Sequence, residues 1–205
     1  DLYAMRWKAV ADADDFLDPI EPARLSYAAE SKHGYKTGTQ SPDIEAEQEK
    51  LIWADAIIFQ FPLWWFSAPA ILKGWVERVF AYGFAYGVGV HGGERWGDRY
   101  GEGSLLGRRA LLSVTIGGRE PHYSPRGVNG PLDDLLWPIQ HGTLYYPGIS
   151  VLPPFVLYQV EGIRAHGPVN YVKGWLPAGV SGPAAVPIFF IEVISQFMRI
   201  ISLSV

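Results

Sequence analysis

The clearest hydrophobic pattern in this 205-residue chain lies between residues 54 and 80. Residues 56–59 form an apolar run of branched and aromatic side chains, which is typical of a strand buried on both faces of a sheet. Pro62 should end this strand, because proline cannot donate to a sheet ladder. From Pro69 to Phe80, apolar positions recur at helical spacing with charged residues between them. The stretch therefore predicts a strand, an aromatic loop and a helix.

A further helix is predicted before this unit, and a strand and a helix after it. Residues 41–43 have the composition of a helix start, with a hydroxyl, a proline and an acid, and this helix should run to about Trp53. Its buried side should consist of Ile44, Gln48, Leu51 and Ile52. Residues 108–114 predict a second buried strand, and residues 132–144 predict a helix that Pro138 interrupts.

The other segments show no sustained period. Residues 1–5 resemble the end of a strand, residues 6–40 predict a long excursion without regular structure, and residues 83–107 predict a glycine-rich loop. Residues 149–158 predict a last strand that two prolines cut short. Because strands and helices alternate and no repeat or second domain is visible, we expect residues 1–205 to form one α/β domain with a doubly wound parallel sheet.

Composition excludes several classes of protein. The chain is 48% hydrophobic and contains eight tryptophans, which is typical of a globular protein. Its formal charge of −4 offers no basic field for nucleic acid. Without cysteine there is no disulfide, thiolate nucleophile or Cys-ligated metal, and a cytoplasmic location is expected. No signal peptide is evident, and no apolar run reaches the ~20 residues of a transmembrane helix.

Familiar catalytic and metal motifs are missing from the sequence. The five histidines never stand three or four residues apart, so zinc is not expected. Neither a Gly-x-Ser-x-Gly elbow nor a phosphate-binding Gly-x-x-x-x-Gly-Lys loop occurs. Residues 87–92 formally match the dinucleotide fingerprint. They follow a predicted helix and precede a loop, so coincidence is the better interpretation.

Two loops that follow neighbouring predicted strands form a candidate site. Residues 63–66, Leu-Trp-Trp-Phe, offer aromatic surface, whereas residues 115–118, Thr-Ile-Gly-Gly, offer backbone N–H groups and are followed by the phenol of Tyr123. Ligands of parallel sheets bind where loops leave the carboxyl ends of the strands. Together the loops suit a planar heterocycle with polar edges, such as a flavin. On composition alone, aromatic residues that only fill the core are an equally good interpretation.

Several long motifs resemble the NAD(P)H:quinone oxidoreductase family of flavodoxin-like FAD enzymes. They are IIFQFPLWWFSAPAILKGWVERVF, LSVTIGGREPHYSPRGVNG and LLWPIQHGTLYYPG, with DLYAM and SPDIEAEQEKL further upstream. They follow the family's order over about residues 1–160, and the likeness is weak in residues 161–205. The resemblance implies a flavodoxin-like sheet in which the family's first strand and first helix have no counterpart. It therefore predicts an amino-terminally truncated chain that binds FAD poorly.

The resemblance also implies which residues hold the flavin. The cofactor-binding positions are Leu63, Trp64, Trp65, Phe66, Thr115, Ile116, Gly117, Gly118 and Tyr123. The first loop would lie along the isoalloxazine ring, and the second would hold its other edge. Ile116 stands where the family usually has threonine, which removes one hydroxyl from that edge.

Catalytic and substrate-binding residues are implied in the same way. Tyr123 matches a tyrosine beside the flavin N1–O2 region, and Asn129 stands where one branch of the family has a histidine that partners this tyrosine. The implied substrate-binding residues are Tyr86, His122 and Tyr146. Since Tyr86 matches a tyrosine that reaches the neighbouring subunit, a homodimer is expected. The aromatic content also suits an obligate interface.

The implied function is the two-electron reduction of quinones by NAD(P)H. A hydride would pass from the nicotinamide to N5 of FAD, and then from the same face of the flavin to a quinone. Two alternatives stay open. Some relatives are ancillary regulatory subunits of potassium efflux systems, for which a membrane partner matters more than turnover. A chain unable to hold FAD would be inactive.

Overall fold

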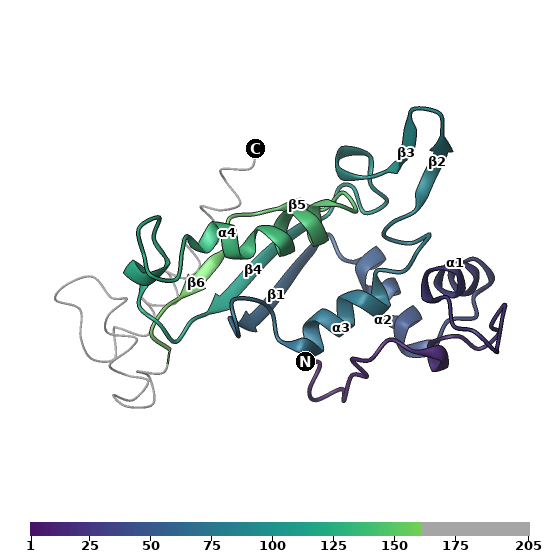
Figure 1. Cartoon of the computed structure of the whole chain (residues 1–205), viewed down its shortest axis with the longest axis horizontal. Helices are drawn as coiled ribbons and strands as arrows, with labels where there is room; N and C mark the ends of the chain where they lie inside the picture. The colour runs from purple at the N-terminus through teal and green to yellow at the C-terminus, as the bar shows by residue number, and fades with distance from the viewer. Residues whose placement is uncertain (161–205) are drawn as a thin grey trace.

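The computed structural model describes residues 1–160 of the chain (Figure 1), and the weakly matching residues 161–205 lie outside the described part. Its main sheet contains the strands β1 (Ala56–Pro62), β4 (Arg109–Thr115), β5 (Ser150–Val151) and β6 (Phe155–Leu157). β4 pairs with β1 along its whole length and with β5 and β6 at its two ends, always in parallel. The predicted last strand is thus two short strands separated by its prolines. This sheet and its helices confirm the α/β class.

Helices connect these strands. The α-helices are α1 (Tyr27–Thr37), α2 (Pro42–Trp53), α3 (Ala70–Val79) and α4 (Leu132–Trp137). The π-helix η4 (Pro138–Tyr145) continues α4, and short 3₁₀ helices are η1 (Ala13–Asp15), η2 (Tyr100–Glu102) and η3 (Glu120–Tyr123). The predictions of α2, α3 and a helix interrupted at Pro138 are confirmed. π-Helical segments are rare and often occur at functional sites.

Two predictions for the segment before α2 are wrong. Residues 1–5 form hydrogen-bonded turns instead of the end of a strand, and the N–H of Trp7 donates to the C=O of Leu2 at 2.9 Å. Residues 27–37, expected to be irregular, form α1. The buried residues of α1 are Glu30, Ser31 and Gly34. Because none of these is apolar, this helix has no hydrophobic period that the sequence could reveal.

Residues 83–107 contain a β-hairpin where only a loop was expected. Its antiparallel strands are β2 (Val88–Gly92) and β3 (Arg95–Asp98), and Figure 1 shows them projecting from the body of the molecule. Gly92 and Gly93 both have positive φ, at 137° and 61°, where a side chain would be strained. Since residues 87–92 lead into a hairpin and not from a strand into a helix, their match to the dinucleotide fingerprint is coincidental.

β1 is buried on one face only, so its predicted burial on both faces is wrong within the described structure. Phe59 and Phe61 are buried, and the ring of Phe59 contacts Trp75 of α3 at a centroid distance of 5.8 Å. On the opposite face, Ile58 is 56% exposed. The buried side of α2 is also smaller than predicted. Ile44, Gln48 and Leu51 are buried, whereas Ile52 is exposed.

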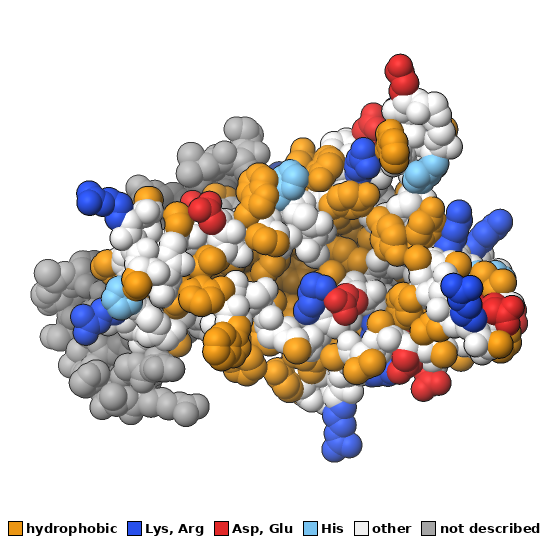
Figure 2. All heavy atoms as spheres, viewed as in Figure 1, with side chains coloured by type: hydrophobic (Ala, Val, Ile, Leu, Met, Phe, Trp, Pro, Cys, Tyr) orange, Lys and Arg blue, Asp and Glu red, His pale blue; other side chains and the backbone are white. Residues whose placement is uncertain are grey.

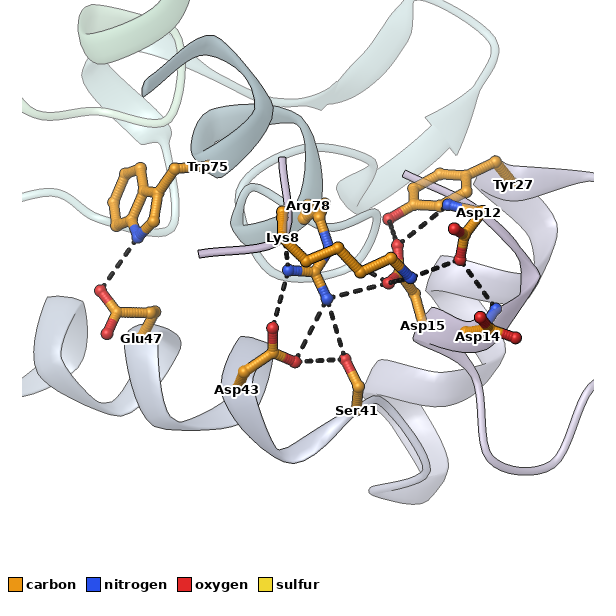
Figure 3. Close-up of polar contacts among 10 residues, drawn as sticks. All are labelled: Lys8, Asp12, Asp14, Asp15, Tyr27, Ser41, Asp43, Glu47, Trp75 and Arg78. Atoms are coloured by element: carbon orange, nitrogen blue, oxygen red, sulfur yellow. Dashed lines mark hydrogen bonds and ion pairs between the residues drawn. The ribbon is translucent and has the colours of Figure 1, made fainter. Parts of the chain in front are cut away.

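A buried arginine joins the N-terminal segment to α3 (Figure 3). Arg78, 2% exposed, donates from Nε and Nη2 to Asp15 Oδ1 at 3.1 and 2.8 Å. Its Nη1 donates to Asp43 Oδ2 at 2.7 Å and to the Lys8 C=O at 2.9 Å. The guanidinium also lies over the ring of Trp7, 4.6 Å from its centroid. One side chain therefore connects α3 with two segments that precede the sheet.

Two neighbours complete this cluster. Lys8 Nζ pairs with Asp15 Oδ1 at 3.0 Å and also with Asp12. The Tyr27 hydroxyl donates to Asp15 Oδ2 at 2.8 Å, and burial together with this carboxylate raises the pKa of Tyr27. Both oxygens of Asp15, which is fully buried, are thus hydrogen-bonded, as a buried carboxylate requires.

The cluster predicts that stability depends on pH. Burial acts to raise the pKa of Asp43, but hydrogen bonds from Arg78 and Ser41 lower it below its usual value. Because the pKa is lower in the folded state, this stabilisation is present above the unfolded carboxyl pKa of about 3.9 and is lost as pH falls through the folded pKa. We expect the urea midpoint to fall between about pH 5 and 3, and Asp43→Asn to flatten that fall.

Asp14→Asn is the matched control for this titration. The Asp14 carboxylate is exposed and makes no hydrogen bond within residues 1–160. The control should leave the pH profile of the urea midpoint unchanged. Equal flattening by both variants would contradict the assignment to the Arg78 cluster.

Candidate functional site

The carboxyl ends of β1 and β4 bring the two candidate loops together. The strands are paired in register with Pro62 opposite Thr115, so they end at the same level of the sheet (Figure 1). The N–H of Leu63 donates to the C=O of Thr115 at 2.8 Å. The aromatic loop therefore starts directly beside the last residue of β4.

Residues 64–67 form a tight turn closed by two hydrogen bonds. The N–H of Trp64 donates to the Ser67 C=O, and the N–H of Ser67 donates to the Trp64 C=O, both at 3.0 Å. The central residues Trp65 and Phe66 have φ values of 48° and 62°. Two positive φ angles are typical of a type I′ turn, which favours Asn-Gly. For residues with a Cβ, each such conformation costs roughly 1–2 kcal/mol.

The aromatic side chains of this turn face solvent. Trp64, Trp65 and Phe66 are 54%, 96% and 47% exposed, whereas Leu63 packs against the core. The interpretation that these three aromatic residues only fill the core is therefore wrong. Strained backbone concentrates at functional sites, and adjacent exposed aromatic rings are typical of binding surfaces. The turn combines both features.

The second loop presents backbone donors. Within residues 1–160, the N–H groups of Gly117 and Gly118 have no hydrogen-bond partner, and neither do those of Trp65 and Phe66. Ile116 differs from its neighbours, because its side chain is 1% exposed and its N–H donates to the Leu157 C=O at 2.7 Å. It anchors the loop to β6 and directs no side chain to the surface.

Tyr123 lies against this loop, at the end of η3. A Cβ on Gly118 would be 3.1 Å from the Tyr123 ring and 3.3 Å from its hydroxyl, so glycine allows the close approach. The N–H of Asn129 donates to the His122 C=O at 2.9 Å and closes the segment between them. No hydrogen bond joins the side chains of Asn129 and Tyr123 among the described residues, and His122 is exposed.

Tyr86 and Tyr146 lie in a different place. They line a hollow of about 330 Å³ together with Val76 and Phe80. Burial raises the pKa of the half-buried Tyr86. None of residues 63–66 or 115–118 lines this hollow. Within one chain, the predicted substrate-binding residues Tyr86 and Tyr146 therefore line a different hollow from the one that residues 63–66 and 115–118 would border.

An aromatic cluster around η4, of which only Tyr146 was predicted to matter, was missed in the sequence. It consists of Tyr100, Trp137, His141, Tyr145 and Tyr146. Trp137 stacks on His141 with a centroid distance of 4.4 Å and an interplanar angle of 12°. Trp137, His141 and Tyr145 stand four residues apart, and this spacing was the available signal. Trp137 and Tyr145 are 59% and 40% exposed, so the cluster offers a second aromatic surface.

The parallel sheet and its helices define a flavodoxin-like α/β fold, in which ligands bind at the edge where the aromatic turn and the glycine loop lie. A family model described as flavodoxin-like fold matches residues 1–172, and the chain belongs to this family. It is 43% identical to human ribosyldihydronicotinamide dehydrogenase (quinone), over 85% of this chain and 73% of that protein. The family indicated by the sequence motifs is confirmed.

Other relatives agree with this assignment. The ribosyldihydronicotinamide dehydrogenase-like protein traD of Penicillium crustosum is 54% identical over 78% of this chain and 60% of its own length. NAD(P)H dehydrogenase (quinone) 1 of Rattus norvegicus is 42% identical over 85% of this chain and 61% of its own. The chain thus spans about three fifths of these two relatives.

A crystal structure from Klebsiella pneumoniae, assigned to a quinone reductase, is 63% identical with a TM-score of 0.76. The match covers 78% of this chain and 62% of that one. An NAD(P)H:quinone oxidoreductase from Methanothermobacter marburgensis shares the fold at 21% identity, with a TM-score of 0.55. Within residues 1–160, no helix has the length and apolar character of a membrane span, and no cluster of three potential metal ligands occurs.

Proposed function

We propose that this protein reduces quinones by two electrons at the expense of NAD(P)H, with FAD held between residues 63–66 and 115–118. The observation that carries the proposal is the strained, exposed aromatic turn next to the glycine loop, where four backbone N–H groups have no partner within residues 1–160. The relatives named for quinone dehydrogenase activity support it. Because this chain spans only about three fifths of two of its relatives, their activity is proposed for it and not carried over directly.

The residues at this edge fit a flavin. Trp64, Trp65 and Phe66 supply apolar surface for a flat ring, and the N–H groups of Gly117 and Gly118 suit the nitrogen and oxygen atoms along its rim. The glycines allow the backbone to approach closely. A bound flavin would supply the hydride-transfer chemistry between NAD(P)H and the quinone.

The chain would contribute to catalysis through hydrogen-bond donors that are held in place at this edge. Negative charge that develops along the rim of the ring during hydride transfer is stabilised by hydrogen-bond donors already in place. The N–H groups of Gly117 and Gly118 and the Tyr123 hydroxyl are the candidate donors. Gly118 positions Tyr123, because any Cβ there would meet the tyrosine ring.

Substitution of Tyr123 tests this role. Tyr123→Phe removes one of several donors, so flavin reduction by NAD(P)H should slow by no more than about 10–100-fold in stopped-flow measurements. Asn129→Ala should have a smaller effect, since its side chain makes no hydrogen bond to Tyr123 in the described structure. An unchanged rate in both variants would overturn the charge-stabilising role.

Replacing Trp65 and Phe66 by Asn and Gly tests whether the turn is kept for binding. Asn-Gly suits a type I′ turn, so the free energy of unfolding should rise by about 1–2 kcal/mol. FAD affinity should fall at the same time, because two rings are lost. Urea denaturation and a fluorescence titration with FAD measure the two effects.

Trp53→Asn is the matched control for the turn, because Trp53 is 85% exposed at the end of α2. It should leave FAD affinity unchanged. A loss of stability in the Asn-Gly variant would show that the turn is not strained, and unchanged FAD affinity would remove it from the binding site.

The visible absorption spectrum of the purified protein is the first test of the function. Flavin bands, FAD on release of the cofactor, and quinone-dependent oxidation of NAD(P)H would support the proposed function against the expectation that this chain binds FAD poorly. A colourless protein that added FAD does not convert would favour the inactive alternative. Capture of a potassium efflux protein with negligible turnover would favour the ancillary-subunit alternative.

We infer that a homodimer completes the site. Tyr86 and Tyr146 lie apart from the aromatic turn, and the aromatic cluster of η4 supplies exposed apolar surface. Figure 2 shows hydrophobic side chains over α4 on this face, and a charged pair over α3. A twofold dimer uses the same patch on both subunits, and the family resemblance assigns Tyr86 to the partner's site. A monodisperse monomer with bound flavin in sedimentation would contradict this.

A further inference from the structure

We propose that residues 119–126 form a phosphate-binding site for the hydride donor, in which the guanidinium groups of Arg119 and Arg126 bind the phosphate. This inference rests on the proposed function and answers a question that the function leaves open. The rat relative is named for NAD(P)H and the human relative for ribosyldihydronicotinamide, and only the first of these donors carries phosphate. The two arginines select a donor with phosphate.

The site begins where the proposed flavin edge ends. Arg119 follows Gly118 directly and precedes η3, whose last residue is Tyr123. A donor that stacks on a flavin at this edge extends beyond the rim of the ring. Its phosphates are the strongly charged part of the donor, and charge-assisted hydrogen bonds are their best partners. Residues 119–126 adjoin the rim and are in a position to supply them.

Short backbone contacts hold these residues in one compact loop. The N–H of Asn129 donates to the His122 C=O at 2.9 Å. A Cβ at Gly127 would lie 2.2 Å from the same C=O oxygen, so glycine is required where the chain folds back on η3. This fold returns Arg126, the neighbour of Gly127, to the helix that Arg119 precedes. The two arginines therefore belong to one fixed loop.

The positive charge of both arginines is available to a ligand. Both side chains are exposed, and neither forms an ion pair or a side-chain hydrogen bond within residues 1–160. Glu120 is the one acid among residues 115–131, and it pairs with neither arginine. Residues 61–72, which contain the aromatic turn, carry no charged side chain. Arg119 and Arg126 are thus the only arginines or lysines in these two segments.

The chemistry of the guanidinium group selects phosphate among the parts of a donor. Its planar set of N–H groups can bind phosphate through two hydrogen bonds, whereas the nicotinamide and ribose groups are polar without a negative charge. The whole chain has a formal charge of −4, which disfavours an anionic donor. A local excess of positive charge beside the flavin edge offsets this repulsion where the donor has to bind.

Stopped-flow reduction of the FAD-saturated full chain tests the inference with NADPH, NADH and dihydronicotinamide riboside, which carries no phosphate. Arg119→Gln and Arg126→Gln should each lower the second-order rate constant with NADPH about tenfold and leave the rate with the riboside unchanged. Added salt should slow the unsubstituted protein with NADPH and not with the riboside. A loss confined to NADPH would assign the arginines to its 2′-phosphate, and an equal loss with NADH would assign them to the pyrophosphate.

Arg24→Gln is the matched control, because it removes the same charge from another exposed arginine. Arg24 forms no ion pair within residues 1–160, and it precedes α1, which Figure 1 shows at the opposite end of the molecule from the carboxyl end of β4. All three rates should stay unchanged in this variant. Equal losses with NADPH and the riboside, unchanged rates in both test variants, or a similar loss in the control would overturn the inference. A loss of FAD affinity in the test variants would also overturn it, because the arginines would then bind the phosphates of the flavin.

A binding measurement separates this inference from the proposed function, because it needs no hydride transfer. The probes are NADP⁺ and nicotinamide riboside, each added to the full chain with saturating FAD while the arginine Nε–H signals are followed by NMR. The signals of Arg119 and Arg126 should shift with NADP⁺ and not with the riboside, whereas that of Arg24 should not move. These shifts without flavin reduction by any donor would overturn the proposed function and support the phosphate site. Flavin reduction without these shifts would support the function and overturn the phosphate site.

Discussion

Arg78→Met should lower the free energy of unfolding by about 3–5 kcal/mol, because it leaves a buried charge without its partner. Asp15 is fully buried and receives two hydrogen bonds from Arg78. Methionine keeps much of the volume and removes the charge. Lys8 still contacts Asp15, but one partly buried lysine cannot replace a planar guanidinium that serves two carboxylates and a backbone C=O. The change in urea-induced unfolding measures the loss.

Lys73→Met is the matched control on the same helix. Lys73 pairs with Glu77 on the surface, where both side chains are more than half exposed, and such pairs contribute about 0–1 kcal/mol. A similar small loss for Arg78→Met would show that the N-terminal segment is held to α3 by its apolar contacts and not by this cluster.

The elements that the sequence predicted well are those whose apolar residues show a clear period. β1, β4, α2 and α3 each bury a hydrophobic run or stripe, and their bounds agree with the pattern to within about two residues. α1 buries polar residues and glycine, so its pattern carried no signal. The β2–β3 hairpin is largely exposed, and its glycines were therefore indistinguishable from those of a loop.

Arg78 shows why tertiary contacts stay hidden in one sequence. Between the apolar positions of α3 it resembles a solvated charge, yet it is 2% exposed. Its partners Asp15 and Asp43 lie 63 and 35 positions away, and no local pattern marks them. Only the folded chain shows that these charges meet.

The sequence predicted where the two loops of the candidate site lie, but it did not predict the backbone conformation of the aromatic turn. Residues 63–66 and 115–118 follow two buried strands, and the parallel sheet places both loops at one edge. The turn at Trp65 and Phe66 contradicts the preference of type I′ turns for Asn and Gly, so the sequence gives no sign of it. A local preference that is violated in this way is typical of functional positions.

Gly74→Ala should lower the free energy of unfolding by about 1–3 kcal/mol or more. Gly74 is buried in α3, where the chain at Ala9 crosses the helix. A Cβ at Gly74 would lie 2.1 Å from the Ala9 C=O oxygen and 2.7 Å from its carbon. Because both are backbone atoms, relief requires the N-terminal segment to move away from α3.

That movement would also pull on the Arg78 cluster, since Lys8, next to Ala9, supplies one of its acceptors. The double variant should therefore lose less unfolding free energy than the sum of the losses caused by Gly74→Ala and Arg78→Met alone. Gly142→Ala is the control, because nothing lies within 4 Å of its Cβ position, and its effect should stay within about 0.5 kcal/mol. Urea denaturation of the two single variants, their double variant and the control measures all four values. Fully additive losses would show that the crossing at Gly74 and the buried arginine stabilise the N-terminal segment independently.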